Sequence, residues 1–201
     1  DVATELGLLD AITEMLLDEI TDAQPRLLAA FGARVTTSIN ISAQQAAAPV
    51  RMAALLDRLT ATGRADRFAI ELTENALLDP VAFQRRVLPL LRRAGVRVSI
   101  DDFGTGYASL ASLLDITVEE LKIDRAFVHR IHERPRSQII VQALTAAGRE
   151  LAVSVVAEGV ESCEELGYLL GATTIGIAQG YLFAPPMTFG ELLAGRDQIA
   201  A

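Results

Sequence analysis

Residues 96–107 read Val-Arg-Val-Ser-Ile-Asp-Asp-Phe-Gly-Thr-Gly-Tyr, so two adjacent acids, Asp101 and Asp102, directly follow a short apolar run. Successive side chains of a β-strand point to opposite faces, so both carboxylates can serve one site only if the strand stops there and the backbone turns. Gly104 and Gly106 permit such a turn, because glycine adopts backbone conformations that other residues avoid. Two close negative charges are costly unless a cation joins them. The stretch therefore predicts half of a metal site with oxygen ligands at the end of a strand.

The composition is that of an ordinary globular protein, and it excludes several functional classes. The chain of 201 residues is 51% hydrophobic and 22% charged, which suits one domain with a sizeable core, placed here at residues 1–201. The net charge of −8 argues against broad electrostatic binding of DNA. No apolar run has the length needed to span a bilayer. The single cysteine, Cys163, excludes an intramolecular disulfide and fits a reducing compartment.

Six short runs rich in apolar and β-branched residues alternate with helical patterns. Most of the runs are apolar through the middle, as in strands that are buried on both faces. The predicted strands are Arg34–Ile41, Phe68–Leu72, Val96–Ile100, Glu120–Ile123, Ala152–Ala157 and Thr174–Ala178. Alternation of strands and helices implies right-handed βαβ units and a parallel sheet.

Apolar spacing and capping residues predict the intervening helices. Near the N-terminus, five apolar residues repeat at helical spacing and predict an amphipathic helix: Leu8, Ile12, Met15, Leu16 and Ile20. Residues 80–94 form a second predicted helix, which we expect Pro89 to kink. Ser162 begins a capping box for a further helix, which we expect to end at Gly171.

Polar residues at the strand ends distinguish between two ways of arranging such a sheet. An open doubly wound sheet and a (β/α)₈ barrel both fit the alternation, but only in a barrel do all strand ends converge on one mouth. Six polar residues fall at or just past the C-terminal ends of six different strands: Asn40, Glu71, Asp101, Lys122, Glu158 and Gln179. The sequence therefore predicts an α/β fold of the (β/α)₈ TIM-like type, with about six of the eight strands present.

The acids in this set indicate chemistry that depends on divalent metal ions. The set contains no histidine and no cysteine, and all-oxygen ligation suits Mg²⁺ or Mn²⁺. Four acids with one lysine are enough for two ions, and two-metal sites hydrolyse phosphodiesters. These acids are Glu71, Asp101, Asp102 and Glu158. Lys122 lies between apolar residues, where we expect it to orient a water molecule or to stabilise charge on a phosphoryl oxygen. Proton abstraction in an enolase-like barrel also uses acids and a lysine, but it fits the paired aspartates less well.

Six motifs stand in the order and rough spacing of a known family. They are Asn40-Ile41-Ser42, Glu71-Leu72-Thr73-Glu74, Asp101-Asp102-Phe103-Gly104-Thr105-Gly106-Tyr107, Leu121-Lys122-Ile123-Asp124, Ala157-Glu158-Gly159-Val160-Glu161 and Gln179-Gly180-Tyr181-Leu182-Phe183. Together they resemble the EAL domain, a family of bacterial phosphodiesterases that hydrolyse cyclic di-GMP to linear pGpG. The resemblance covers essentially the whole chain and implies a modified (β/α)₈ barrel with one antiparallel strand.

The resemblance also implies roles for the matched residues. Those that resemble ligands of two Mg²⁺ or Mn²⁺ ions are Asn40, Glu71, Asp101 and Asp102. Lys122 resembles the residue near the attacking water, and Glu158 resembles the general base or a partner of the metal site. Those that resemble substrate contacts or supports of the loop at 103–109 are Glu74, Thr105, Gln179, Phe183 and Pro185.

The Glu-Ala-Leu segment after which the family is named does not occur in these 201 residues. We therefore expect a longer parent protein, impaired turnover by this piece, and exposed sheet edges that need a covering segment for solubility. The resemblance implies cyclic di-GMP as ligand, a homodimer formed through loop 103–109, sensor or GGDEF-type domains in the parent, and a bacterial cytoplasmic location, although the parent could be membrane-anchored. The alternative function is a non-catalytic domain that binds cyclic di-GMP or another protein.

Overall fold

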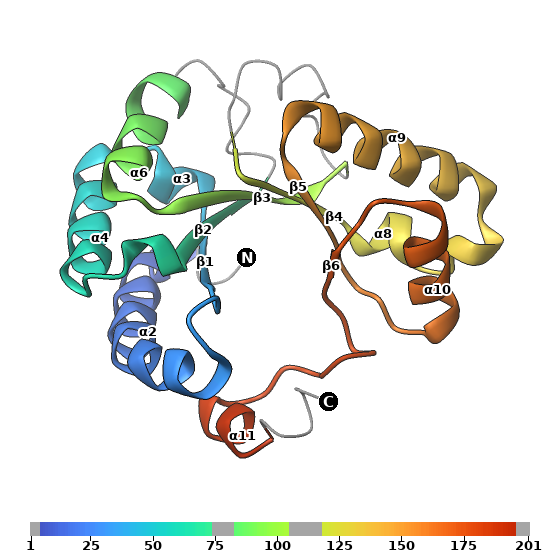
Figure 1. The fold of residues 1–201 in the computed structure, drawn as a ribbon. Helices are drawn as coiled ribbons and strands as arrows, with labels where there is room; N and C mark the ends of the chain where they lie inside the picture. The colour runs from blue at the N-terminus through green and yellow to red at the C-terminus, as the bar shows by residue number, and fades with distance from the viewer. Residues whose placement is uncertain (1–4, 74–82, 105–117, 196–201) are drawn as a thin grey trace.

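A computed structural model describes residues 5–73, 83–104 and 118–195. Its centre is a six-stranded sheet in which every neighbouring pair is parallel and the strand order follows the sequence. Figure 1 shows the strands as an inner ring that is open between β1 and β6, with the helices around the outside. The strands are β1 (Thr37–Ile41), β2 (Phe68–Thr73), β3 (Arg97–Phe103), β4 (Glu120–Ile123), β5 (Ser154–Ala157) and β6 (Ile177–Ala178). The predicted α/β fold with a parallel sheet is confirmed.

The strand that carries the paired aspartates differs from its prediction at one end. We expected it to stop at Ile100, but β3 continues through both acids to Phe103. Its pairing with β4 shifts register between Ile100 and Phe103, and Asp102 has a positive φ of 54°. A bulge of this kind redirects side chains without ending the strand. It therefore supplies the change of direction that we had assigned to a turn.

The described helices are α2 (Leu9–Phe31), α3 (Ala43–Ala46), α4 (Pro49–Ala61), α6 (Leu88–Ala94), α8 (Arg125–Val128), α9 (Pro135–Leu151), α10 (Cys163–Ala172) and α11 (Phe189–Ala194). Among them, α2, α6 and α10 lie in the three segments predicted above, with some differences in their ends. The capping box predicted at Ser162 is present, but α10 ends at Ala172, one residue beyond the predicted Gly171. Pro89 lies in the first turn of α6, after a π-helical turn at Phe83–Val87. A proline in that position needs no amide partner, so it begins a helix where we expected a kink.

The N-terminal helix is present, but its predicted apolar face is not its buried face. Met15 is 64% exposed and Ile12 is 38% exposed, whereas Leu17 is fully buried. The side of α2 that packs against the rest of the molecule is formed by Leu17, Ala23, Gln24 and Leu27. The spacing of apolar residues predicted the helix correctly, but it did not predict which face of the helix is buried.

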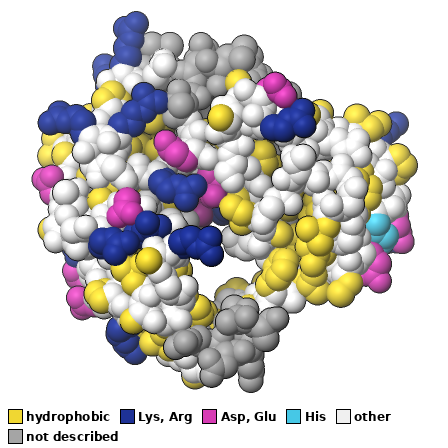
Figure 2. Space-filling view, viewed as in Figure 1, with side chains coloured by type: hydrophobic (Ala, Val, Ile, Leu, Met, Phe, Trp, Pro, Cys, Tyr) yellow, Lys and Arg dark blue, Asp and Glu magenta, His cyan; other side chains and the backbone are white. Residues whose placement is uncertain are grey.

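The core lies between the sheet and the helices that surround it. Its fully buried large side chains come mainly from the strands and from α4 and α6; they include Phe68, Ile70, Leu59, Leu91, Ile100 and Leu121. Among the described residues, no helix has the combination of length and apolar character that crossing a membrane requires. Figure 2 shows hydrophobic side chains gathered beside β6 and α10, where Leu170 and Ile177 are exposed.

The two ends of the described chain meet through their helices. β1 and β6 are the edge strands of the sheet. Outside them, α11 packs against α2, with the Arg26 guanidinium 4.6 Å from the centre of the Phe189 ring. Figure 1 shows α11 beside the C-terminal part of α2, so this contact completes the outer ring.

Candidate active site

The parallel register brings the predicted polar residues to the carboxyl ends of the strands. Asn40 of β1 is paired with Glu71 of β2, and Asp101 of β3 is paired with Thr73. Lys122 lies in β4, and Glu158 directly follows β5. The carboxyl ends of parallel strands lie at the same end of a barrel, which explains how residues so far apart in sequence come together.

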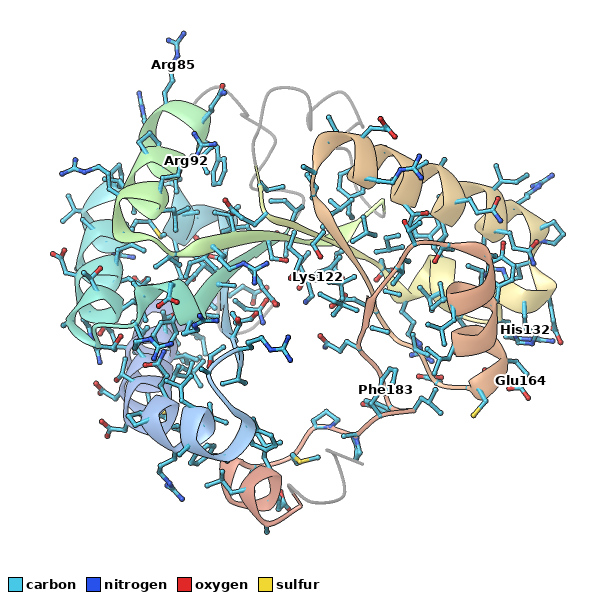
Figure 3. The ribbon with its side chains drawn as sticks, viewed as in Figure 1. Arg85, Arg92, Lys122, His132, Glu164 and Phe183 are labelled. Carbon is cyan, nitrogen blue, oxygen red and sulfur yellow. The ribbon has the colours of Figure 1, made fainter. Side chains whose placement is uncertain are left out.

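Lys122 is the centre of this cluster and is only 4% exposed. Its Nζ atom lies 2.6 Å from Oε1 of Glu158, 2.9 Å from Oε2 of Glu71 and 3.1 Å from Oδ1 of Asp101. Figure 3 shows Lys122 in the middle of the molecule, inside the ring of strands. Burial acts to lower the pKa of this ammonium, but its bonds to Glu158 and Glu71 outweigh burial and raise the pKa. The lysine is therefore held as a cation among three carboxylates.

The carboxyl group of Glu158 has a pKa raised to about 7, chiefly because burial disfavours its charged form. Contact with Lys122 acts to lower this pKa, and the neighbouring Asp101 carboxylate acts to raise it. A carboxyl group with a pKa near neutrality can both accept and release a proton at physiological pH.

The paired aspartates approach one another across the bulge of β3. The amide N–H of Asp102 donates to Oδ1 of Asp101 at 3.1 Å. One carboxylate oxygen from each of Asp101, Asp102 and Glu158 lies within 4.8 Å of the others, as in a group able to hold a metal ion. Burial raises the pKa of Asp102, and repulsion from Asp101 adds to the effect. The two carboxylates therefore lie close enough to share one site.

Asp124 is a member of the cluster to which the sequence analysis gave no role. Its charge raises the pKa of Asp102, so the two carboxylates are close. Its Oδ1 atom also accepts a hydrogen bond from the N–H of Ala126 at 2.8 Å, which caps α8. The available signal was its place two residues after Lys122, directly past the end of β4.

The remaining predicted residues are exposed or lie outside the described residues. Asn40 and Gln179 are exposed, and the backbone of Gln179 bonds to Ala157 and Val160. Phe183 is 52% exposed on the segment after β6, apart from Lys122 in Figure 3. Pro185 is exposed on the same segment.

Two predicted supports and most of their loop cannot be placed. Glu74, Thr105 and residues 105–109 of the predicted loop lie outside the described residues. Of the loop's beginning, Gly104 packs so closely on α8 that a Cβ atom there would lie 2.8 Å from the ring of Phe127.

Comparison with known proteins gives the family. The model of the EAL domain matches residues 1–186. This chain belongs to the EAL domain family. It is 35% identical over 200 residues to the bifunctional diguanylate cyclase/cyclic di-GMP phosphodiesterase MucR of Pseudomonas aeruginosa, covering 96% of this chain and 28% of MucR.

Solved structures of EAL domains share the fold. The PaMucR phosphodiesterase in complex with c-di-GMP superimposes with a TM-score of 0.87 at 33% identity, over 95% of this chain and 77% of that one. A manganese/c-di-GMP complex of BlrP1 from Klebsiella pneumoniae gives a TM-score of 0.77 at 33% identity, over 87% of this chain and 44% of that one. EAL domains have a TIM-barrel-like fold, so the predicted fold class is confirmed. The chain spans less than a third of the length of the curated relative MucR.

Proposed function

We propose that this domain is a phosphodiesterase that hydrolyses cyclic di-GMP to linear pGpG. The observation that carries the proposal is the position of Lys122, whose ammonium lies within 3.1 Å of three carboxylates at the strand ends. The names of related proteins and of solved neighbours support the substrate, because MucR is a cyclic di-GMP phosphodiesterase and BlrP1 holds c-di-GMP with manganese.

The donor atoms of the site fit a hard divalent cation. Oxygens of Asp101, Asp102 and Glu158 are close enough to share one ion. We propose Mg²⁺ or Mn²⁺, two in number, with Asn40 and Glu71 as further ligands from β1 and β2. Ions bound there would polarise a phosphoryl oxygen and make a water molecule more acidic.

Two side chains of the chain itself would move protons and stabilise charge. The Lys122 ammonium is buried and fixed, so it would stabilise negative charge on a phosphoryl or leaving oxygen more strongly than an exposed lysine does. Glu158, whose Oε1 atom lies 2.6 Å from the Lys122 ammonium, would accept a proton from the attacking water. In this scheme Gln179, Phe183 and Pro185 contact the substrate, and Glu74 with Thr105 supports loop 103–109.

The organisation of the intact protein is part of the proposal. Residues 1–201 act as a single EAL-type domain, which functions as a homodimer formed through the region of loop 103–109. The combined activities in the name of MucR support a parent protein that also carries a nucleotide cyclase or sensor domain. The reducing environment suggested by a lone, exposed Cys163 supports a cytoplasmic location.

The test is a chromatographic assay of cyclic di-GMP with Mg²⁺, Mn²⁺ or no metal, on this chain and on the intact protein that contains it. We expect metal-dependent formation of pGpG by the intact protein, weaker turnover by the isolated chain, and loss of turnover in Lys122→Met. Calorimetry on the same samples separates the alternative: tight binding of cyclic di-GMP by the intact protein without turnover in either metal would identify a receptor and refute the enzyme.

A further inference from the structure

The loop at residues 158–162, which carries Glu158, is fixed on one side to the segment after β6. The N–H of Val160 donates to the carbonyl oxygen of Gln179 at 3.0 Å, and the carbonyl oxygen of Val160 accepts from the N–H of Leu182 at 3.0 Å. These two backbone hydrogen bonds hold the middle of the loop against the segment after β6.

On its other side the loop at 158–162 contacts α8, the helix that follows the strand of Lys122. Arg125, the first residue of α8, forms an ion pair with Glu161 at 2.9 Å. Its side-chain stem covers Gly159 so closely that a Cβ atom there would lie 2.4 Å from Cγ of Arg125. The ion pair is partly exposed and contributes little by itself, so the close packing matters more for the position of the loop.

Glu165 makes a stronger connection between the loop at 158–162 and the turn that follows α8. Its side chain is 2% exposed. Its Oε2 atom accepts the amide N–H groups of Glu161 and Ser162 at 2.8 and 3.1 Å, and its Oε1 atom accepts that of Arg130 at 2.7 Å. Arg130 follows α8, in a left-handed turn with φ of 53°. A buried carboxylate is costly unless such bonds satisfy it, and charge-assisted bonds are the stronger kind.

The bond to Arg130 is not explained by helix capping. A capping box needs one side-chain oxygen that accepts the N-cap amide, and glutamine supplies it as well as glutamate does. Gln45 does so at Ser42, at the start of α3. The second acceptor oxygen of Glu165 holds the amide of Arg130 and also lies 3.7 Å from Nδ1 of His129. Glutamate has that oxygen and glutamine does not.

We propose that Glu165 is a positioning residue for Glu158. It ties the loop at 158–162 to the turn after α8, so that Glu158 keeps its 2.6 Å contact with Lys122. The inference rests on the proposed function, in which Glu158 and Lys122 act together.

The test compares three substitutions in the intact protein. Glu165→Gln keeps an oxygen for the amides of Glu161 and Ser162 and loses the bond to Arg130. Ser162→Ala is the matched control on the same helix, because it removes the hydroxyl that accepts the N–H of Glu165 at 3.2 Å and leaves the carboxylate in place. Glu191→Gln is a distant control, since Glu191 caps α11 in the same way but is exposed.

We expect Glu165→Gln to lower kcat and to weaken Mn²⁺ binding by about tenfold each, as loss of a partner that orients a metal-site residue does, with KM changed less than about twofold. Ser162→Ala lowers the thermal midpoint while kcat and Mn²⁺ affinity stay within about twofold of wild type, as in Glu191→Gln. If Glu165 acts through Glu158, the double variant Glu158→Gln/Glu165→Gln is no slower than Glu158→Gln alone.

Wild-type kcat and Mn²⁺ affinity in folded Glu165→Gln would overturn the proposal and leave Glu165 as a helix cap, and so would additive losses in the double variant. If Glu165→Gln does not fold, Glu165→Asp replaces it, because the shorter carboxylate keeps the charge but cannot reach both loops. A wild-type protein that binds Mn²⁺ without turnover refutes the proposed function, and the Mn²⁺ titrations still decide the role of Glu165. Absence of Mn²⁺ binding by the wild type overturns both the proposed function and the positioning role of Glu165.

Discussion

The Nζ atom of Lys122, in β4, lies 2.6 Å from Oε1 of Glu158, which directly follows β5, and the lysine side chain is buried. Lys122 also faces Glu71 and Asp101, so one cation is shared by three acids. Removing one carboxylate leaves the lysine paired with the other two, whereas removing the lysine leaves Glu71, Asp101 and Glu158 without their shared cation. The two sides of the contact therefore differ in what they contribute to stability.

Lys122→Met should lower the free energy of unfolding of the metal-free protein by about 3 kcal/mol. Removing one partner of a buried ion pair leaves the opposite charge buried without compensation. Mn²⁺ should restore part of this loss in the variant, since a cation again joins the acids. Urea unfolding with chelator and with Mn²⁺ measures both effects. The control is Arg51→Met, whose exposed pair with Asp10 should contribute less than about 1 kcal/mol. Equal losses in the two variants would contradict the prediction.

Glu158 predicts a pH dependence with a definite sign. Its pKa in the folded protein is about 7, above the ordinary value of 4.5, so between these values the folded state binds a proton that the unfolded state has released. The free energy of unfolding of the metal-free protein should therefore fall as pH rises from about 4.5 to about 7, by roughly 1–3 kcal/mol, and this contribution is fully present only below that window. Glu158→Gln lacks this proton, so its stability relative to wild type should improve over the same range. Urea midpoints measured with chelator at several pH values check it, and a constant difference between the two proteins would refute it.

Much of the fold could be predicted because its signals are local. Apolar β-branched runs marked all six strands, and the Ser162 capping box marked the start of α10. The end of β3 was misjudged because the bulge between Ile100 and Phe103 depends on pairing with β4, which no local pattern contains. The buried face of α2 was misjudged for the same reason, since Leu17 is covered by distant segments.

In the candidate site, too, features with a local sequence signal could be predicted and features that depend on distant contacts could not. The position of the acids near the strand ends was visible in the sequence, although β3 continues past Asp101 and Asp102 to Phe103. The contact of Lys122 with three carboxylates depends on the curvature of the barrel. The hydrogen bond from Arg130 to the second carboxylate oxygen of Glu165 forms only when two loops pack together. Asp124 was noted only as part of a motif, because its closeness to Asp102 depends on the bulge of β3.

Glu165 should give a pH dependence opposite in sign to that of Glu158. Burial acts to raise its pKa, but hydrogen bonds from the amides of Arg130, Glu161 and Ser162 outweigh burial and lower the pKa below the ordinary 4.5. A lowered pKa stabilises the folded state above that ordinary value, and the stabilisation is lost as pH falls through the folded-state value. The difference in stability between wild type and Glu165→Gln should thus be greatest near neutral pH and shrink below about pH 4.5. Chemical unfolding of both proteins from acid to neutral pH tests this, and a gap that widens on acidification would contradict it.

Gly180 provides the sharpest test of how the loop at 158–162 is held, because its backbone lies against that of Val160. A Cβ atom at Gly180 would lie 2.1 Å from the carbonyl oxygen and 2.3 Å from the nitrogen of Val160, and backbone atoms cannot move aside as the end of a flexible side chain can. Gly180→Ala should therefore separate the two segments and destabilise the fold by about 2–4 kcal/mol, within the range of overpacking and lost backbone hydrogen bonds. Gly167→Ala is the matched control: it lies within α10 with no atom within 4 Å of the added Cβ, and alanine there should stabilise the helix by up to about 1 kcal/mol. Thermal and urea unfolding measure both variants. If Gly180→Ala is as stable as wild type, the close approach of Gly180 to Val160 does not constrain the loop at 158–162.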